Sequence, residues 1–460
     1  MQPTTTANSE SASSDKPTAK TPLRSWYALG LLFLVYVFNF IDRSILGILN
    51  QAIKEDLALT DTQMGFLGGI AFAIFYTFLG IPIARLADRS VRRNVLAVSL
   101  TIWSLMTAVC GFAGNFVQLL LARIGVAVGE AGGSPPSHSM ISDLFPPSRR
   151  ATALAIYALG IPVGSMLGNL TGGWLNEAFD WRTAFIVVGL PGVVLALVVR
   201  FTLAEPERGA SEPERQAEQE TPPVGEVFRY LWAKRSFRYL SLGGALHAFV
   251  GYGVGYWIPA FFIRSHGLGT GELGTWLFYL GFAGMAGTFL GGYMGDRLAR
   301  RDLRWYTWLP GIATLASVPF SVAVYLVSDY STALLLMIIP TILGSYYLGP
   351  TFALTQALVG LRMRALASSI LLFILNLIGM GLGPQFTGIL SDLLNAYSSL
   401  GIESLRIALL CVLFFNVIST LYYLLAARYL RKDMADAESA NAKSASQNAA
   451  SHPPAAAPAG

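Results

Sequence analysis

The stretches ARLADRSVRR at residues 84–93 and GYMGDRLARR at residues 292–301 both contain the string Asp-Arg-x-x-Arg-Arg. Each follows a long apolar run, and the aspartates of the two strings, Asp88 and Asp296, are 208 residues apart. Two such strings at matching places along the chain indicate an internal duplication, which many membrane transporters carry. The sequence therefore predicts two similar halves.

The composition indicates that lipid surrounds most of the chain. Of the 460 residues, 53% are hydrophobic and 13% are charged, whereas a soluble protein averages about a quarter charged residues. So few charges cannot cover a surface that faces water. The net charge is +5, which in a membrane protein reflects basic residues in cytoplasmic loops. Nucleic-acid binding is not expected, because no basic stretch is interleaved with aromatic residues.

Twelve apolar runs are long enough to form the helices of ~20 residues that cross a bilayer. They do not alternate polar and apolar residues, which excludes a closed barrel. The expected fold is all-α: a polytopic membrane protein with twelve transmembrane helices in two pseudo-symmetric six-helix bundles. The expected spans are 26–49, 62–86, 94–114, 116–138, 150–175, 183–203, 237–264, 272–296, 306–328, 331–358, 365–391 and 404–428.

Polar segments divide the chain into five expected parts. A disordered tail at 1–24 precedes the first bundle at 25–203, and a linker at 204–236 leads to the second bundle at 237–432 and a disordered tail at 433–460. The linker contains a short amphipathic stretch at its end, Val227 to Trp232, which suits a membrane surface. Basic residues gather in the loops on one side, so both tails and the linker are expected in the cytoplasm.

Four ionisable residues lie inside the expected spans of the first half: Asp42, Arg43, Arg123 and Glu130. Each costs at least about 2.5–3.5 kcal/mol at the bilayer centre and needs a reason to be there. Asp42 lies about 24 Å along its helix and Arg123 about 10 Å along a helix that enters from the other side, so their levels are similar. Asn39 shares a helix face with Asp42 and Arg43. Asp42 and Arg43 point about 100° apart, so each is expected to find a partner on another helix.

A helix shift that changes the partner of a buried carboxylate would bind or release a proton. A carboxylate beside an arginine stays ionised, whereas burial without that partner favours the protonated form. Asp42 and Glu130 are therefore candidate proton carriers, and Arg43 and Arg123 candidate ligands of an anionic head group. Two alternatives to these roles stay open. In the first, Arg123 and Glu130, which are two helical turns apart, form a purely structural buried pair. In the second, Asp42 holds helices together as an ion-pair partner and has no role with protons.

The deep polar residues of the second half are mostly neutral. A cavity with charge on one side and aromatic or amide groups on the other suits an amphipathic substrate with an ionic head. His247 as a satisfied core histidine and Tyr346 as a helix-packing residue are the alternatives. Besides the two arginines, the residues expected to contact the substrate are Asn39, His247, Tyr256, Tyr346, Gln356 and Asn376.

The repeated string resembles the G-x-L-a-D-R-x-G-R-K/R motif of the major facilitator superfamily, which follows helix two and is echoed after helix eight. Ala84 and Val91 replace two glycines of the motif in the first copy. The resemblance implies charge contacts between helix ends when the cytoplasmic side is closed; the alternative is that the basic residues only set topology. The implied gate residues are Arg85, Asp88, Arg89, Arg93, Asp296 and Arg297.

Two further stretches resemble the spinster group of this superfamily: FNFIDR at residues 38–43 and RIGVAVGEA at residues 123–131. Animal members of the group export sphingosine-1-phosphate or lysophospholipids, and their residues at the positions of Asp42, Arg43, Arg123 and Glu130 are implicated in coupling and substrate handling. The resemblance implies a proton-coupled secondary transporter that moves an amphipathic lipid by alternating access. The alanine-rich tail favours a bacterial member, expected as a monomer in the inner membrane.

Transport of small organic anions or drugs is the alternative function, because related organic-anion symporters share a similar first helix. An enzyme is not expected, since the four scattered histidines provide no clustered site. No cofactor or metal is expected, and a proton gradient is the expected energy source. The expected partners are the substrate and membrane lipids. The glycine spacing between Gly160 and Gly173 fits an antiporter motif and helix packing equally well, so the direction of transport stays open.

Overall fold

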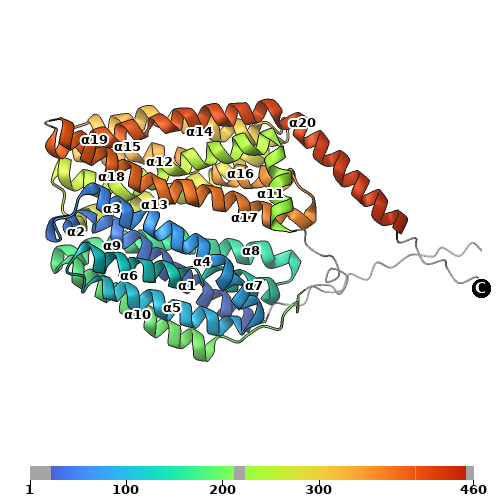
Figure 1. Cartoon of the computed structure of the whole chain (residues 1–460), viewed down its shortest axis with the longest axis horizontal. Coiled ribbons are helices and arrows are strands. Elements are labelled where there is room, and N and C mark those ends of the chain that lie inside the picture. The colour runs from blue at the N-terminus through green and yellow to red at the C-terminus, as the bar shows by residue number, and fades with distance from the viewer. Residues whose placement is uncertain (1–21, 212–222, 399, 452–460) are drawn as a thin grey trace, which may run out of the picture.

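The computed structural model describes residues 22–211, 223–398 and 400–451 (Figure 1). Twelve of its helical segments are long and apolar enough to cross a membrane, and the described residues contain no strand. The all-α class and the twelve expected spans are therefore confirmed. The observed segments are Leu23–Ile48, Asp61–Arg89, Arg92–Cys110, Phe116–Leu144, Pro147–Ala178, Trp181–Thr202, Arg235–His266, Thr270–Ala299, Trp305–Leu326, Tyr330–Ala357, Arg364–Tyr397 and Gly401–Ala437.

Several of these spans consist of two helices in succession, because glycines and prolines interrupt the hydrogen-bond ladder. The first half contains α1 (Leu23–Ile48), α2 (Asn50–Asp56), α3 (Asp61–Gly68), α4 (Ile70–Arg89), α5 (Arg92–Cys110), α6 (Phe116–Glu130), α7 (Ser134–Leu144), α8 (Pro147–Ala158), α9 (Gly160–Ala178) and α10 (Trp181–Thr202). The second half contains α11 (Val224–Ala233), α12 (Arg235–His266), α13 (Thr270–Ala299), α14 (Trp305–Leu326), α15 (Tyr330–Gly344), α16 (Leu348–Ala357), η2 (Leu361–Met363), α17 (Arg364–Leu375), η3 (Asn376–Leu382), α18 (Gly383–Tyr397), η4 (Gly401–Glu403), α19 (Ser404–Val412) and α20 (Phe414–Ser451).

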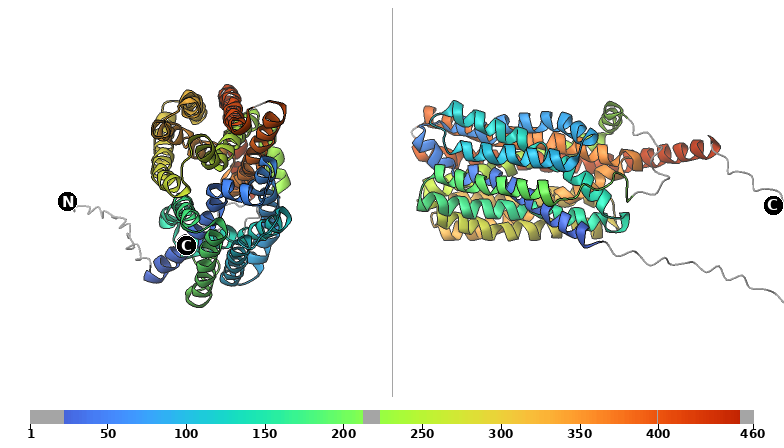
Figure 2. Two further views of the ribbon diagram at one scale, coloured as in Figure 1. Left: turned by 90° about the vertical axis from the view of Figure 1, so that its left-hand side faces the viewer. Right: turned by 90° about the horizontal axis from the view of Figure 1, so that it is seen from below.

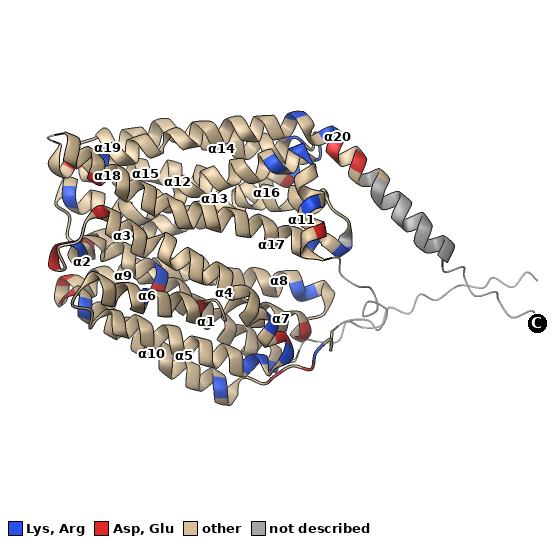
Figure 3. Ribbon diagram, viewed as in Figure 1, with Lys and Arg blue, Asp and Glu red and all other residues tan. Residues whose placement is uncertain are grey.

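The two halves form two bundles whose helices run roughly parallel, the first half below the second in Figure 1. Helix α1 begins and helix α20 leaves the bundle at the same end of the molecule, here named the terminal end (Figures 1 and 2). The opposite end, named the far end, carries α2 and the start of α3. Charged residues concentrate at these two ends, with many basic residues at the terminal end (Figure 3). Most of the helix length between the two ends is free of charge.

The C-terminal boundary differs from the expectation. Helix α20 continues through Ser451, where a disordered tail was expected from residue 433. The segment after 433 is rich in alanine, which has the highest helix propensity of all residues, so a helix that has already begun extends readily. The expected tail residues 1–21 and 452–460, and part of the expected linker, 212–222, lie outside the described residues.

The break in the fourth span determines where its glutamate sits. Helix α6 ends at Glu130, and α7 begins at Ser134 with prolines in its first turn. Close packing holds the α6 backbone there, because a Cβ atom at Gly129 would lie 2.6 Å from the backbone nitrogen of Trp103. A larger residue at Gly129 would push α6 away from α5. Glu130 is thus held in the interior of the first bundle.

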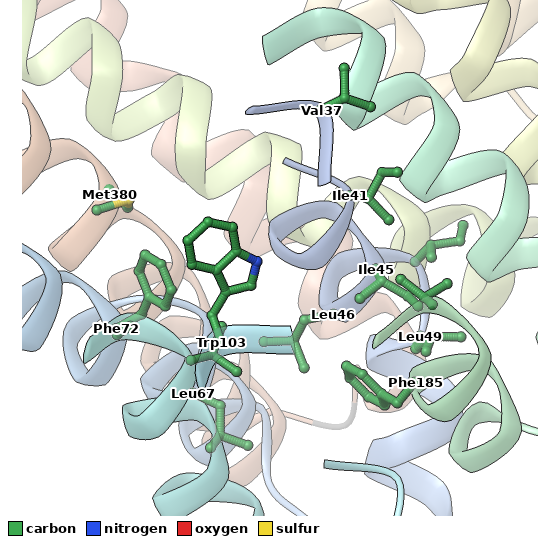
Figure 4. Packing of buried hydrophobic residues seen from close by; sticks show 14 of the residues in the cluster. Val37, Ile41, Ile45, Leu46, Leu49, Leu67, Phe72, Trp103, Phe185 and Met380 are labelled. Carbon is green, nitrogen blue, oxygen red and sulfur yellow. The ribbon is translucent and has the colours of Figure 1, made fainter. Parts of the chain in front are cut away.

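One continuous apolar core joins the two halves. Figure 4 shows Met380, from η3 of the second half, in the same cluster as Phe72 and Trp103 of the first half. Glycines bring the backbones of the two halves together, since a Cβ atom at Gly274 would lie 2.4 Å from the carbonyl oxygen of Asn169. Such small residues permit close helix packing without a polar partner.

The glycines at four-residue spacing in α9 face α1. Cβ atoms at Gly164 and Gly168 would meet the backbone carbonyls of Val37 and Ile41 at 2.4 and 2.8 Å. This part of the pattern is therefore a helix-packing surface within the first half, as the packing alternative predicted.

A network of charges closes the far end, and we name it the far-end latch. The carboxylate of Asp61, which is 2% exposed, accepts hydrogen bonds from Lys54 (2.5 Å), from two nitrogens of Arg264 (2.7 and 2.8 Å) and from Ser391 (2.6 Å). Asp392 accepts from the backbone nitrogens of Asp61 and Thr62. Because Arg264, Ser391 and Asp392 belong to the second half, the latch ties the two halves together.

We predict that Asp61→Asn loosens the far end. Hydrogen bonds to charged groups contribute about 1.5–3 kcal/mol each, so losing even one raises the share of molecules with an open far end by about tenfold or more. Pulsed electron resonance between spin labels at residues 55 and 397 measures this opening. Asp56→Asn is the matched control, because Asp56 pairs at 2.5 Å with Arg182 of its own half. Equal distance distributions in Asp61→Asn and the unmodified chain would contradict the assignment of the latch.

Candidate functional site

Two cavities lie next to each other near the middle of the molecule. The charged chamber, about 310 Å³, lies between the halves and is lined by Phe40, Arg43, Ser44, Leu46, Gly47, Gly68, Phe72, Arg123, Ser165, Asn169, Gly251, Tyr252, Gly255, Tyr256, Met380 and Pro384. The apolar chamber, about 420 Å³, lies inside the second half among α12, α14, α15 and the α19–α20 segment. Gly251, Tyr252 and Gly255 of α12 line both chambers. The two cavities therefore share a wall.

Arg43 and Glu130 form an ion pair at the edge of the charged chamber. Arg43 Nε donates to Glu130 Oε2 at 2.6 Å, and the side chain of Glu130 is fully buried while that of Arg43 is 18% exposed. The guanidinium also lies 4.9, 5.1 and 4.4 Å from the ring centres of Phe40, Phe72 and Tyr76. Cation–π contacts of this kind gain strength when water is excluded. Arg43 thus has the partner on another helix that its position required.

Arg123 also contacts the ring of Phe72. Its guanidinium is 5.3 Å from the centre of that ring, and its Nη1 reaches the backbone carbonyl of Asp42 at 3.5 Å. In this conformation Glu130 is paired with Arg43, so the alternative of an Arg123–Glu130 pair along one helix is not what the contacts favour. Phe72 therefore contacts both arginines.

The acids lie behind the arginines. Arg43 and Arg123 line the charged chamber, whereas Asp42, Glu130 and Asn39, which are 1%, 1% and 4% exposed, do not. One side-chain oxygen of each of these three residues has no hydrogen-bond partner among the described residues. A buried polar atom without a partner costs about 1–3 kcal/mol. The cluster is therefore not arranged for maximal stability, which is common at functional sites.

The apolar chamber contains one polar cluster, centred on His247. Its Nε2 donates to the carbonyl oxygen of Gly344 at 2.8 Å, and its Nδ1 lies 3.2 Å from both Asn416 Oδ1 and Thr314 Oγ1. The ring of Tyr347 lies 4.5 Å away. Both nitrogens of His247 have partners in the second half, as a satisfied core histidine would, and the side chain still lines the chamber.

Other candidate residues of the second half lie in different places. Tyr256 lines the charged chamber, and its hydroxyl donates to the carbonyl oxygen of Met64 at 2.8 Å. Gln356 donates to Ser368 at 3.0 Å, and Asn376 begins η3; neither of them lines a chamber.

Tyr346 lies outside both chambers. Its side chain packs with Leu309 and Ala313. Tyr346 and Tyr347 both lie in the break between the end of α15 at Gly344 and the start of α16 at Leu348, and of the two only Tyr347 lines the apolar chamber. The packing alternative for Tyr346 therefore fits the structure.

Sequence reasoning missed three residues that shape the site. Phe72 contacts both arginines, Tyr252 stands between the chambers, and Asn416 is a partner of His247. Asn416 could have been predicted from the sequence, since an amide side chain inside an apolar span is rare. Phe72 and Tyr252 carried none, because aromatic residues are common in every span.

The implied gate residues lie at the terminal end. Arg85, Asp88 and Arg89 are exposed. Arg93 donates from its backbone nitrogen to Glu205 at 2.8 Å and from its side chain to the carbonyl oxygen of Leu203.

The most buried basic residue of the repeated string was not among the expected gate residues. Arg92 is 1% exposed, pairs with Asp143, and donates to Glu205 at 2.8 Å. In the second copy, Asp296 accepts from Tyr306 and Arg297 donates to Tyr293. These contacts lie within their own halves, so the gate between halves stays a prediction for another conformation.

Comparison with known proteins identifies the family. Residues 32–384 match the model of the Major Facilitator Superfamily. An MFS-type efflux pump of Mycolicibacterium smegmatis is 36% identical over 90% of this chain and 95% of its own length, and protein spinster homolog 3 of Danio rerio is 29% identical over 93% and 89%.

A solved structure shares the fold. It is a bacterial homologue of the human lysosomal transporter spinster in an inward-facing, unoccupied conformation, and it is 36% identical to this chain with a TM-score of 0.83. The alignment covers 89% of this chain and 98% of that one. This chain is therefore a spinster-like secondary transporter, not an enzyme, and it belongs to the Major Facilitator Superfamily.

Proposed function

We propose that this transporter moves an amphipathic lipid with an anionic head, such as a lysophospholipid or a sphingoid phosphate, coupled to protons. The observation that carries the proposal is the shared wall of the two chambers at Gly251, Tyr252 and Gly255. An anionic head fits beside Arg43 and Arg123, and one apolar chain fits in the adjoining chamber. Each buried methylene contributes about 0.8 kcal/mol, so the apolar chamber favours a long tail.

The ion pair supplies a route to coupling. Arg43 is the residue of the pair that faces the charged chamber, so an anionic head that binds there competes with Glu130 for the same guanidinium. A buried carboxylate that loses its cationic partner favours the protonated form. Binding of the anion and uptake of a proton at Glu130 therefore support each other. Asp42 is the second proposed proton carrier, and its backbone carbonyl lies 3.5 Å from Arg123 Nη1.

The proposed orientation puts the terminal end in the cytoplasm of a bacterium, with the protein in the inner membrane. Its support is the excess of basic residues in the loops at that end. With the far-end latch closed, the conformation described here then corresponds to an inward-facing state, like that of the similar bacterial structure. Release of the latch and closure of the terminal end would complete alternating access, with Arg85, Asp88, Arg89, Arg93, Asp296 and Arg297 as the proposed gate.

Transport of small organic anions or drugs is the second candidate. The charged chamber alone has room for a small anion, and a relative of this chain is named as an efflux pump. The two candidates differ in whether the apolar chamber is used.

We predict that Glu130→Gln and Asp42→Asn uncouple transport from protons. An amide cannot take up the proton, so uptake of a lysophospholipid into liposomes no longer responds to an imposed pH gradient. The hydrogen-bonding shape of the site is largely kept. Glu403→Gln is the control, because Glu403 pairs with Arg406 at the far end, outside both chambers. Full pH dependence in both acid variants would remove Asp42 and Glu130 from the mechanism.

We predict that Gly251→Phe blocks lipid transport and spares small anions. A Cβ atom at Gly251 would meet no atom within 4 Å, so the new ring projects into the space that joins the chambers without disturbing the helix. Uptake of long-chain lysolipids should fall by at least about tenfold, the effect of roughly 1.4 kcal/mol, while uptake of a short carboxylate is kept.

Gly30→Phe is the matched control, since a Cβ atom there also meets open space but lies on an exposed part of α1 that lines neither chamber. Unchanged transport of long-chain lipids by Gly251→Phe would favour the second candidate.

A further inference from the structure

Helix α11 has an apolar surface that the protein does not cover. Val227 and Leu231 are fully buried against α12 and α17, in a cluster with Phe237 and Ile370. On the adjacent face Val224, Phe228 and Trp232 are 59%, 43% and 38% exposed. Their spacing of four residues aligns them in one stripe along the helix. The rings of Phe228 and Trp232 are stacked, with centres 5.5 Å apart.

The third face of α11 is polar. Glu226 and Arg229 are exposed there, and Arg229 has no ion-pair partner among the described residues. Arg235, at the start of α12, is also exposed and lies over the ring of Tyr429. Around its axis, α11 thus has a face that packs on the protein, then the exposed apolar stripe, and then the polar face. A helix at a membrane surface has this order, with aromatic residues toward lipid and basic residues toward the head groups.

The position of α11 fits the same environment. Figures 1 and 2 show that it runs across the terminal end of the bundle, not along it, and that it lies at the outer edge, level with the ends of the spans. Helix α11 therefore lies next to the lateral surface of the bundle. If the spans cross the bilayer, α11 is expected at the boundary between head groups and acyl chains, where aromatic side chains anchor membrane proteins.

We propose that α11 is a docking surface for anionic phospholipids of the leaflet at the terminal end. The stripe inserts beside the acyl chains, and Arg229 and Arg235 bind the phosphates of lipids such as phosphatidylglycerol. Because α11 packs on α17, which leads into η3 and Met380 of the charged chamber, docked lipid also holds the second half in place around that chamber. This proposal rests on the proposed function in one respect only: the orientation of the protein in the membrane, which determines that the docked lipids belong to the cytoplasmic leaflet.

Spin labels test the docking in the full chain. With Cys411 replaced by serine, a label at residue 228 is compared with a label at residue 226, one on the stripe and one on the polar face. In nanodiscs with phosphatidylglycerol, the label at 228 should be reached by oxygen and shielded from a water-soluble nickel complex, and the label at 226 should show the reverse. In phosphatidylcholine alone, the shielding at 228 should fall.

The double variant Arg229→Gln with Arg235→Gln should remove the response to phosphatidylglycerol. Each substitution should lower the ratio of docked to undocked helix by about fivefold. Arg300→Gln with Arg301→Gln, at another loop of the same end, is the control that keeps the response. A label at 228 that the nickel complex reaches as freely as one at 226, or one that ignores lipid charge, overturns the proposal. These labels report depth without any transport, so the result does not depend on whether the proposed substrate is right.

Discussion

The ion pair between Arg43 and Glu130 is the interaction on which the rest of the account depends. Neither charge can remain in the apolar interior without a partner, because removing one partner of a buried ion pair costs about 3–5 kcal/mol of stability. Any movement of α1 against α6 must therefore provide a new partner for each charge. An anionic head group can replace the carboxylate, and a proton can replace the guanidinium. Because neither charge can stay buried without a partner, the anionic head group and the proton are expected to bind together.

The surrounding structure fits this exchange. The arginines face the charged chamber, and the acids lie behind them, so a ligand meets the cations first. The ring of Phe72 contacts the guanidinium groups of both Arg43 and Arg123. At the far end, the buried carboxylate of Asp61 joins the halves through a separate set of contacts. Binding and closure thus involve different charges, and only the relative movement of the bundles connects them.

The sequence predicted the architecture and the charged residues well, for one physical reason. Apolar runs of the right length have few alternatives to membrane helices, and an ionisable residue within them is too costly to be accidental. Partners were harder to predict. The pairing of Glu130 with Arg43 depends on how α1 and α6 pack, and the end of α6 is held by the contact of Gly129 with Trp103 of α5, a residue distant in the sequence. Tyr346 and Tyr347 could not be distinguished, because they lie in the break between α15 and α16, where the local backbone decides which side chain packs and which lines the cavity. The extent of α20 was missed because alanine-rich sequence is compatible with both a tail and a helix.

The most direct test of the account is a structure of the full protein in lipid nanodiscs with a bound lysophospholipid or sphingoid phosphate. The account predicts the phosphate within hydrogen-bonding distance of Arg43, a longer separation between Arg43 and Glu130, and the hydrocarbon tail beyond Tyr252 among the residues around His247. A head group bound elsewhere, with the Arg43–Glu130 contact unchanged and the space around His247 empty of the tail, would contradict it.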